Sequence, residues 1–391
     1  MDDIVITSAL RTAVGSLGKT LKNTSADDLG SSVISKTILN SNLKNEHIDE
    51  VIMGQVLTGG SGQNPARQAA IKSGIPIEKP AYIVNQVCGS GLRSIISGCQ
   101  SIKTGDSKII ISGGQESMSL APHALHLRDG KKLGDTKLID TMIKDGLWDA
   151  FHGYHMGVTA ENVAEKFQVT RDEQDKFALS SQEKALKAQK ENKFKDEIIN
   201  FKIKSKKSEI DFNKDEHPRE GINLEALSRL KPVFKKDGTV TAGNASGIND
   251  GAAAVVLMNK KEAVRRDLKK LATIKSWASC GVEPALMGTG PIPSTKKALD
   301  LAGWEISDVD LFEINEAFAA QSIAVIKELK IPEQKVNVNG GAIALGHPIG
   351  ASGARILVTL VHEMIKQDKK KGCAALCIGG GMGIAMCIER S

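Results

Sequence analysis

Short apolar runs alternate with amphipathic stretches of helical length along the first part of the chain. Apolar runs flanked by turn residues predict buried strands, and apolar spacings of three and four predict helices. The strands expected on this basis are 4–8, 51–56, 81–87 and 108–112. The helices expected between them are 25–40, 65–74 and 89–105. This βαβαβαβ order predicts a largely parallel sheet with crossover helices.

The last third of the chain repeats this order. The expected strands are 272–279, 309–314, 335–339 and 373–378, and the expected helices are 293–302, 316–330 and 350–366. The helix openings match too, because Ser90-Gly91-Leu92-Arg93 aligns with Ser352-Gly353-Ala354-Arg355 at an offset of 262 (352 minus 90). The double glycines that close the last strand of each set lie 266 apart (379 minus 113). A nearly constant offset over several elements predicts an internal duplication.

The difference between the two halves predicts an inserted domain. In the C-terminal half, a glycine-rich turn leads directly into a second strand, 384–389, whereas the corresponding strand 252–258 follows a detour from 116 to 250. We therefore expect an N-terminal half made of residues 1–118 and 250–268, an inserted loop domain at 119–249, and a C-terminal half at 269–391. Insertions at the carboxyl ends of strands commonly carry ligand specificity.

Composition narrows the class of protein. The 391 residues are 41% hydrophobic and 25% charged, which is enough for a large aliphatic core. The net charge of +6 is mildly basic, but the lysine-rich runs 202–207 and 366–371 lack the interleaved aromatic residues of a nucleic-acid interface. We interpret both runs as solvated faces, with binding of an anionic small molecule left open for the first. No nucleic-acid partner is expected.

The cysteines favour a reducing compartment. Six cysteines are scattered through a long chain, which does not resemble a disulfide framework. No second Cys or His pair accompanies Cys373 and Cys377 at metal-binding spacing, so we expect no metal site. We find no signal-peptide pattern and no apolar run of membrane-spanning length. These features predict a cytoplasmic protein without a membrane partner.

Cys88 is the first candidate for chemistry. It stands between an apolar run and the helix opening Gly89-Ser90-Gly91. Unpaired backbone N–H groups and the helix dipole at such a position favour a thiolate, which is the nucleophilic form of cysteine. The alternative is that Cys88 is a small buried hydrophobe at the end of a strand.

Three further candidates follow expected strands of the C-terminal half: Asn315, His347 and Cys377. In a duplicated fold, equivalent strand ends meet near the pseudo-twofold axis, so these side chains can converge on Cys88. Each has an alternative interpretation. Asn315 could cap the next helix, His347 could bind its own loop backbone, and Cys377 could pack in the core. The glycine cluster 379–383 precedes a strand, which argues against a dinucleotide-binding loop.

Together, four motifs resemble the thiolase family over essentially the whole chain: Cys88-Gly89-Ser90, Asn315-Glu316-Ala317-Phe318, Gly346-His347-Pro348 and Cys377-Ile378-Gly379. The resemblance implies an α/β fold with a duplicated βαβαβαββ pattern. It further implies two mixed sheets in α-β-α-β-α layers, with an inserted loop domain.

The resemblance also implies the catalytic roles. Cys88 would be acylated, His347 would activate it, and Cys377 would act as acid and base. Asn315 would hold a water that, with His347, stabilises an enolate oxygen. The backbone N–H groups of Cys88 and Gly379 would form a second oxyanion hole.

Substrate recognition is expected mainly from the insertion. The segment Gly153-Tyr154-His155-Met156-Gly157 resembles that of short-chain thiolases, in which the histidine contacts the thioester region of coenzyme A (CoA) and the methionine lines the acyl pocket. The other expected substrate-binding residues are Leu147, Arg219, Ser246, Ala317 and Phe318. A serine common in the family is here Ala226, which removes one expected contact to the adenine end.

By resemblance, the expected activity is acetyl-CoA C-acetyltransferase, which condenses two acetyl-CoA molecules into acetoacetyl-CoA and CoA and also catalyses the reverse thiolysis. CoA thioesters are the substrates, and no cofactor is expected. The alternatives are a longer-chain 3-ketoacyl-CoA thiolase and, from another class, a non-catalytic CoA-binding scaffold. Decarboxylating condensing enzymes have histidine or asparagine in place of Cys377. The resemblance also implies a homotetramer of tight dimers, with residues 125–135 as a contact loop.

Overall fold

The computed structural model describes residues 3–204 and 209–391, so positions 205–207 of the first lysine-rich run lie outside the described residues. The strands of the N-terminal half are β1 (Ile4–Arg11), β3 (Glu50–Gly54), β4 (Ala81–Val84), β5 (Ile109–Ser117) and β12 (Asn249–Asn259). Its helices are α1 (Ala26–Asn40), α2 (Pro65–Lys72) and α3 (Ser90–Thr104). The Ser25 side chain caps α1 by accepting a hydrogen bond from the N–H of Asp28.

The C-terminal half contains the same kinds of element. Its strands are β13 (Ala272–Gly281), β14 (Leu311–Ile314), β15 (Lys371–Ile378) and β16 (Met382–Glu389). Its helices are α8 (Pro291–Ala302), α9 (Ala319–Leu329) and α11 (Ser352–Lys366).

The strand order shows the predicted duplication. From the outside inwards, the N-terminal strands run β4-β3-β5-β12-β1 and the C-terminal strands run β14-β15-β16-β13. In each half the outer strands pair in parallel, β3 with β5 in the N-terminal half and β14 with β15 in the C-terminal half. The next pair inwards is antiparallel, β5 with β12 and β15 with β16, respectively. A short antiparallel ladder between β1 and β13, at Ile4–Ile6, joins the two sets into one hydrogen-bonded sheet. The predicted two sheets are therefore connected at one end.

One predicted strand is absent. Residues 335–339 contribute only a single parallel bridge, between Val336 and Phe312. The next residue, Asn337, has a φ of 45°, which takes the backbone out of the extended region. Its side-chain amide instead binds both the N–H and the carbonyl of Ile314, at 2.8 Å each. A side chain thus supplies the hydrogen bonds that a strand backbone would have supplied, and the prediction of a strand here is wrong.

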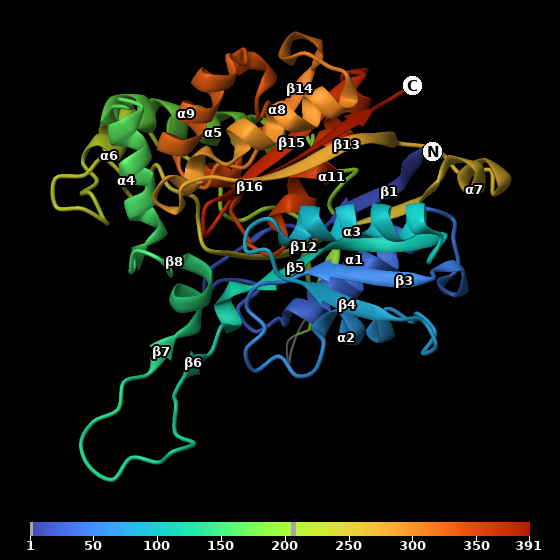
Figure 1. Ribbon diagram of the computed structural model, residues 1–391, viewed down its shortest axis with the longest axis horizontal. Coiled ribbons are helices and arrows are strands. Elements are labelled where there is room, and N and C mark those ends of the chain that lie inside the picture. The colour runs from blue at the N-terminus through green and yellow to red at the C-terminus, as the bar shows by residue number, and fades with distance from the viewer. Residues whose placement is uncertain (1–2, 205–208) are drawn as a thin grey trace.

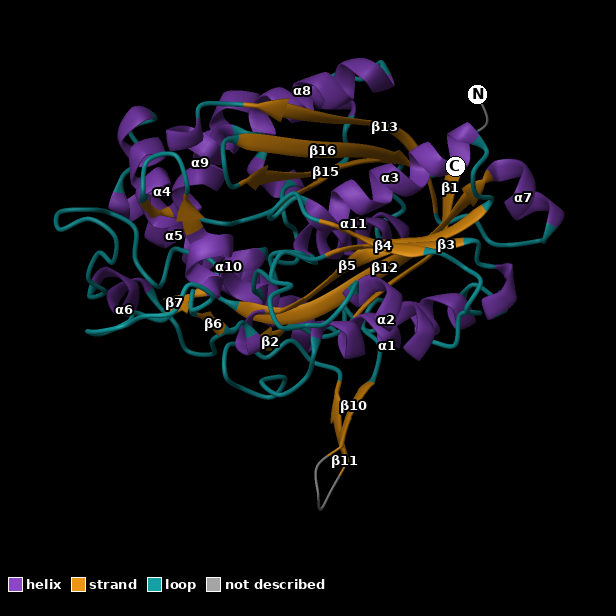
Figure 2. Cartoon of the chain, turned by 60° about the horizontal axis from the view of Figure 1, so that its bottom comes forward, coloured by secondary structure: helices purple, strands orange, loops and turns teal. Residues whose placement is uncertain are grey.

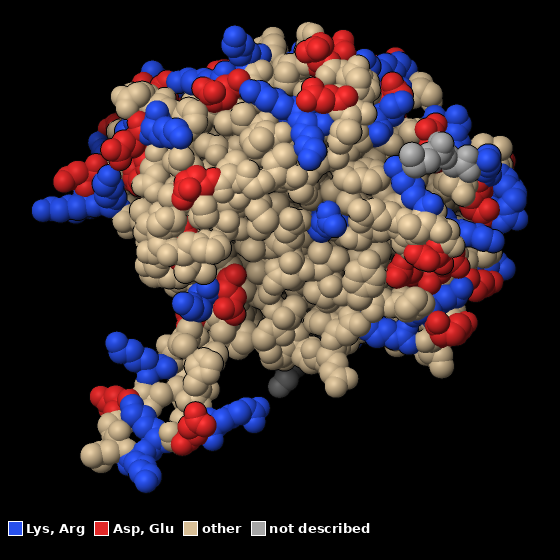
Figure 3. Space-filling view, viewed as in Figure 1, with Lys and Arg blue, Asp and Glu red and all other residues tan. Residues whose placement is uncertain are grey.

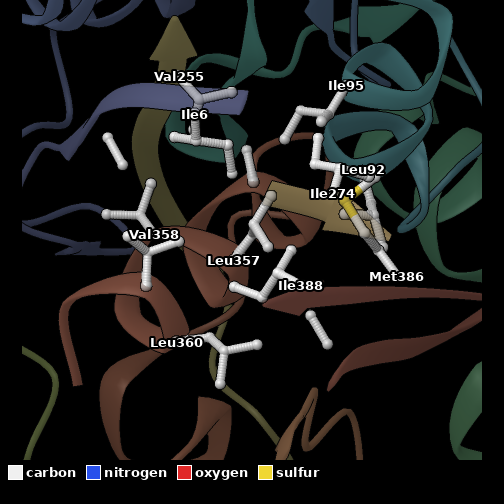
Figure 4. Close-up of a cluster of buried hydrophobic side chains, with 14 of the residues drawn as sticks. Ile6, Leu92, Ile95, Val255, Ile274, Leu357, Val358, Leu360, Met386 and Ile388 are labelled. Carbon is white, nitrogen blue, oxygen red and sulfur yellow. The ribbon is translucent and has the colours of Figure 1, made fainter. Parts of the chain in front are cut away.

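The elements form five layers (Figures 1 and 2). Helices α1 and α2 cover the outer face of the N-terminal strands, α3 and α11 lie together in the middle, and α8 and α9 cover the C-terminal strands. The middle layer is held by apolar side chains from both halves, including Ile6, Leu92, Ile274 and Leu357 (Figure 4). Because close-packed protein interiors have low compressibility, this layer fixes the strand ends of one half relative to those of the other.

The insertion contains helices α4 (Met156–Lys166), α5 (Arg171–Lys190) and α6 (Leu224–Ser228), and the hairpin of β10 (Phe201–Lys204) and β11 (Glu209–Phe212). Its short strands β6 (His123–Ala124) and β7 (Ile139–Asp140) carry a loop that projects from the body (Figure 1). The insertion is tied to β1 through the fully buried Arg11, which binds Glu197 and Asp215 at 2.7 Å each. The boundaries 119 and 249 remain predictions.

Candidate active site

Cys88 lies in a tight turn between β4 and α3. The preceding residue, Val87, has a φ of 46°, and the Ser90 hydroxyl holds the turn by accepting from the N–H of Gln86 and donating to the Val87 carbonyl. The helix begins at Ser90, so Cys88 stands just before the first turn and not on it. The turn aims the thiol across the molecule towards the C-terminal half.

The two halves touch at this turn. A Cβ atom on Gly89 would lie 2.4 Å from the Ile378 side chain, so only glycine fits there. The backbone N–H of Gly379 lies close enough to Cys88 to favour the thiolate and so to act against the rise in the pKa of its thiol. Cys377 is close enough for its pKa to be raised by Cys88, in addition to the larger effect of burial. The structure therefore brings Cys88, Cys377 and Gly379 together, as the sequence predicts.

Burial decides the protonation of Cys88. It raises the pKa of the thiol to about 11, although the N–H groups of Gly379 and of Cys88 itself act in the opposite direction, and the nearby Glu116 raises the pKa slightly further. The expectation that the helix start favours a thiolate is therefore wrong for the free protein. The thiol needs a base at the moment of reaction.

His347 has the orientation of such a base. Its Nδ1 lies 2.5 Å from the hydroxyl of Ser352, which donates its proton to the Pro348 carbonyl at 2.9 Å. A hydroxyl that has donated its only proton can only accept from Nδ1–H, so Nε2 carries the lone pair. That nitrogen faces the amide of Asn315 at 3.4 Å. The imidazole is thus held in the tautomer whose free nitrogen points into the site.

His347 is neutral in the folded protein. Burial, and secondly the positive charge of Arg355, lower the pKa of His347 to about 3. Its backbone N–H donates to Asn249 Oδ1 at 2.9 Å, which fixes the loop as well as the ring. A neutral imidazole with its lone pair on Nε2 is in the protonation state that a general base requires. The alternative of a histidine bound only to its own loop does not account for this arrangement.

Asn315 is fully buried, and its side-chain oxygen has no hydrogen-bond partner among the described residues. It does not cap the following helix, because α9 begins at Ala319 and no side chain caps it. A buried amide oxygen without a partner is costly unless a substrate or a water supplies one. The amide nitrogen of Asn315 thus faces His347 Nε2, and its oxygen is left open to a water or a substrate.

An apolar cluster closes the C-terminal side of the site. The residues that form one buried cluster with Cys377 are Met156, Ala160, Val240, Met287, Ala317 and Phe318, with Phe234 and Ala245 packed against them. A Cβ atom on Gly379 would lie 3.7 Å from the Met156 sulfur, which places that sulfur beside the predicted oxyanion hole. Leu147 lies in a neighbouring cluster with Cys88, Leu57 and Ile349. The predicted acyl-binding residues thus surround the two thiols.

A cavity of about 560 Å³ leads towards this cluster. It is lined by Arg219 and Ser246, both predicted substrate-binding residues, and by Lys19 and His217. Phe234 lines the cavity and also stacks on His155, with ring centres 4.6 Å apart. His155 Nδ1 accepts from the N–H of Gly157, which fixes the ring at the start of α4. The cavity therefore borders the cluster around Cys377, with Phe234 as a shared wall.

Three residues of the site are not predicted to act there. Ser352 and Asn249 hold His347, and the buried Glu116 accepts from the backbone N–H of Gly350 at 2.8 Å. In the sequence, Ser352 stands out only as part of the repeat. Glu116 falls at the beginning of the predicted detour, although a carboxylate closing a buried apolar strand is an unusual feature that the sequence does contain.

Among residues 3–204 and 209–391, no three His, Cys, Asp or Glu side chains are grouped to hold a metal ion. Over the same ranges, no helix is long and apolar enough to span a bilayer. On the face in Figure 3, acidic and basic side chains are interspersed, mostly towards the rim and on the projecting loop.

Comparison with known proteins agrees with this geometry. Residues 4–261 match the family model "Thiolase, N-terminal domain" and residues 268–390 match "Thiolase, C-terminal domain". The acetyl-CoA acetyltransferase of Rhizobium meliloti (strain 1021) is 59% identical over 99% of this chain and 98% of its own. The cytosolic acetyl-CoA acetyltransferase of Rattus norvegicus is 55% identical over 100% and 98%.

Two solved structures have the same fold over the whole chain. The acetyl-CoA acetyltransferase of Bacillus anthracis superposes with a TM-score of 0.98 at 44% identity, and covers 100% of this chain and 99% of its own. Human mitochondrial 3-ketoacyl-CoA thiolase superposes with a TM-score of 0.97 at 42% identity and the same coverage. These matches confirm the predicted layered fold. With both family models and full-length relatives in agreement, the chain belongs to the thiolase family.

Proposed function

We propose that the protein is an acetyl-CoA C-acetyltransferase, an acyltransferase that joins two acetyl-CoA molecules into acetoacetyl-CoA and CoA and also runs the reverse thiolysis. The observation that carries this proposal is the convergence of two thiols from opposite halves, Cys88 and Cys377, beside a neutral His347. Full-length relatives at 55–59% identity, named acetyl-CoA acetyltransferase, support it further.

The first half-reaction is an acyl transfer. His347 Nε2 takes the proton of Cys88 as the sulfur attacks the acetyl-CoA carbonyl. The tetrahedral oxyanion forms opposite the backbone N–H groups of Cys88 and Gly379, both of which act to stabilise negative charge at Cys88. As the intermediate collapses, the bond from the carbonyl carbon to the CoA sulfur breaks. Cys377 donates its proton to the departing CoA and becomes a thiolate.

The second half-reaction forms the carbon–carbon bond. The Cys377 thiolate removes a proton from the methyl group of a second acetyl-CoA, and negative charge develops on the thioester oxygen. Asn315, through a water, and His347, now protonated, stabilise that oxygen. The enolate carbon attacks acetyl-Cys88, the sulfur leaves, and it recovers its proton from His347. Every proton is thus returned, and both thiols end as they began.

We assign the cavity with Arg219 and Ser246 to the nucleotide and pantetheine parts of CoA, with His155 and Leu147 beside the thioester. A cationic rim suits the phosphates, and the apolar wall of Phe234 suits the pantetheine arm. Met156, Ala317 and Phe318 close the cluster around Cys377, which leaves room for a short acyl group and disfavours the longer-chain alternative. CoA thioesters are the substrates, and the mechanism uses no cofactor or metal.

The test is an assay with the purified protein. It should cleave acetoacetyl-CoA in the presence of CoA, with loss of the enolate absorbance, and Cys88→Ala should abolish turnover. Cys99→Ala, which changes a buried cysteine of the core, is the matched control and should keep most of the activity. No turnover by the wild type would reject the enzyme in favour of a CoA-binding scaffold. Faster turnover of eight- or sixteen-carbon substrates would favour the longer-chain thiolase.

The family resemblance also supports a homotetramer of tight dimers in the cytoplasm. Strand β4 is an edge strand with a partly exposed Tyr82, and the middle of the face in Figure 3 carries few charges, as a dimer surface would. The projecting loop exposes Leu127 and Leu133, which suits a contact between dimers. Sedimentation should report four chains, and deletion of 125–135 should reduce this to two. Cell fractionation tests the location.

A further inference from the structure

Glu116 is a buried carboxylate that the proposed mechanism leaves without a role. It is fully shielded from solvent at the end of β5, and its hydrogen bonds come from three backbone N–H groups. Those of Val56 and Gly350 donate to Oε2 at 3.0 and 2.8 Å, and that of Leu57 donates to Oε1 at 3.1 Å. Burial raises the pKa of Glu116 to about 7, although the three N–H groups act in the opposite direction, so the carboxylate is mostly ionised at pH 8. A buried ionised group is expensive, so its retention calls for an explanation.

The three donors come from two different loops. Val56 and Leu57 follow β3 in the N-terminal half, whereas Gly350 belongs to the C-terminal loop that contains His347. The packing is too close for any other residue at 350, since a Cβ atom there would lie 2.5 Å from Glu116 Oε2 and 2.8 Å from the Gln55 backbone. The carboxylate therefore clamps the end of the His347 loop onto β5.

A second carboxylate holds the other end of this loop. Glu316, also fully buried, accepts from the backbone N–H of Ile343 at 3.2 Å and from the side chains of Ser181 and Asn337. The loop that contains His347 is thus fixed on both sides by carboxylates. Of the two, Glu116 lies on the side of Cys88: Val56 and Leu57, whose N–H groups it binds, belong to the cluster against which Cys88 packs. Its charge also raises the pKa of the Cys88 thiol.

We propose that Glu116 is a positioning residue with two separable effects: its hydrogen bonds hold the His347 loop in register with Cys88, and its negative charge restrains the nucleophilicity of the Cys88 thiol before substrate arrives. The proposal rests on the proposed function. Its two effects on Cys88 have opposite signs, because loosening the base slows turnover while removing the charge favours the thiolate. A purely structural role would produce no such opposition.

Glu116→Gln separates the two effects. Glutamine keeps the size of the side chain, but its NH₂ group faces backbone N–H donors and it carries no charge. At pH 8, kcat for thiolysis should fall about 10- to 100-fold, the cost of a base displaced by roughly 1 Å. KM for CoA should change less than about twofold, because Glu116 does not line the CoA cavity. Iodoacetamide should nevertheless label Cys88 about two- to fivefold faster than in the wild type.

Glu116→Asp and Asp250→Asn complete the design. Aspartate keeps the charge but is one methylene too short to span both loops, so it should lower kcat without faster labelling. Asp250→Asn changes another buried carboxylate, which lies on the neighbouring strand and is bound to Ser119. This variant should not combine slower turnover with faster labelling of Cys88. Slower labelling and slower turnover together in Glu116→Gln would overturn the proposal, as would an unchanged kcat. The labelling of Cys88 needs no substrate, so its rate can be measured even if the protein does not cleave acetoacetyl-CoA.

Discussion

The Nδ1 atom of His347 lies 2.5 Å from the hydroxyl oxygen of Ser352, the first residue of α11. Because that hydroxyl donates to the Pro348 carbonyl, it fixes the imidazole with its lone pair on Nε2. Ser352 thus sets the tautomer of the base from outside the site. The same residue opens the repeat that aligns with Ser90, whose hydroxyl likewise binds a backbone carbonyl in the turn before α3.

Ser352→Ala should leave His347 free to adopt the other tautomer. We expect kcat to fall by about 10²-fold or more, since a wrong tautomer in a comparable catalytic triad costs up to about 10⁴-fold. KM should change little, because the CoA cavity is untouched. Steady-state thiolysis measures both. Ser94→Ala, which removes a buried α3 hydroxyl bound to backbone carbonyls, controls for loss of stability, and an equal loss of kcat in that variant would contradict the assignment.

The pH dependence of Cys88 labelling follows from its pKa of about 11. Below this value the thiol form dominates, so the thiolate fraction and the iodoacetamide rate should rise about tenfold per pH unit between pH 7 and pH 10. Since the pKa of His347 is lowered to about 3, its titration should contribute no inflection near the ordinary histidine value of pH 6.5. An inflection near pH 7 should come from Glu116 and be lost in Glu116→Gln. A plateau below pH 8 would contradict both statements. Mass spectrometry of the labelled peptide identifies the site.

Stability of the junction between the insertion and β1 depends on Arg11. This fully buried guanidinium binds Glu197 and Asp215, and Arg11→Ala would leave two buried carboxylates without their partner. Breaking a buried pair in this way typically costs about 3–5 kcal/mol in free energy of unfolding. Chemical denaturation measures the loss. Lys44→Ala removes an exposed ion pair with Glu46 and should change stability by less than about 0.5 kcal/mol.

Much of this fold was predictable because strands and helices follow local periodicity. Ser25 caps α1, and the double glycine at 379–380 closes β15, as the pattern indicates. The double glycine at 113–114 does not close β5, which continues through it to Ser117. The strand expected at 335–339 failed because a single side chain, Asn337, replaced the backbone hydrogen bonds, and apolar periodicity carries no information about that choice.

The site was predictable in its membership but not in its electrostatics. The motifs identified Cys88, Asn315, His347 and Cys377, and the structure brings them together. The expected low pKa of Cys88 was wrong because burial, which sequence alone does not measure, outweighs the helix start. Glu116 was missed for the same reason, since its hydrogen-bond donors come from loops that are distant in sequence.

Proton removal from the substrate provides a direct test of Cys377. Cys377→Ala should lose the exchange of methyl protons of acetyl-CoA with deuterated solvent, because no thiolate remains to remove the proton. Cys88 should still react with iodoacetamide at near the wild-type rate, since burial raises the pKa of Cys377 and keeps its thiol uncharged in the free protein. NMR follows the exchange. Cys373→Ala, four positions earlier on β15 and buried in a separate cluster, is the control. Exchange that persists in Cys377→Ala would assign the base to another group.

Chain-length preference should depend on Met156. Its sulfur lies beside Gly379, and its side chain closes the apolar cluster around Cys377. Met156→Ala removes volume where the acyl chain of a longer substrate would extend, and each methylene accommodated in an apolar pocket is worth about 1–3 kcal/mol. The ratio of kcat/KM for five-carbon over four-carbon 3-ketoacyl-CoA, which differ by one methylene, should therefore rise about 10- to 200-fold. Val169→Ala truncates an apolar side chain in a cluster apart from the thiols and should leave the ratio unchanged. If Met156→Ala lowers kcat/KM equally for both substrates, Met156 acts only in packing. The short-chain preference must then come from another wall of the pocket.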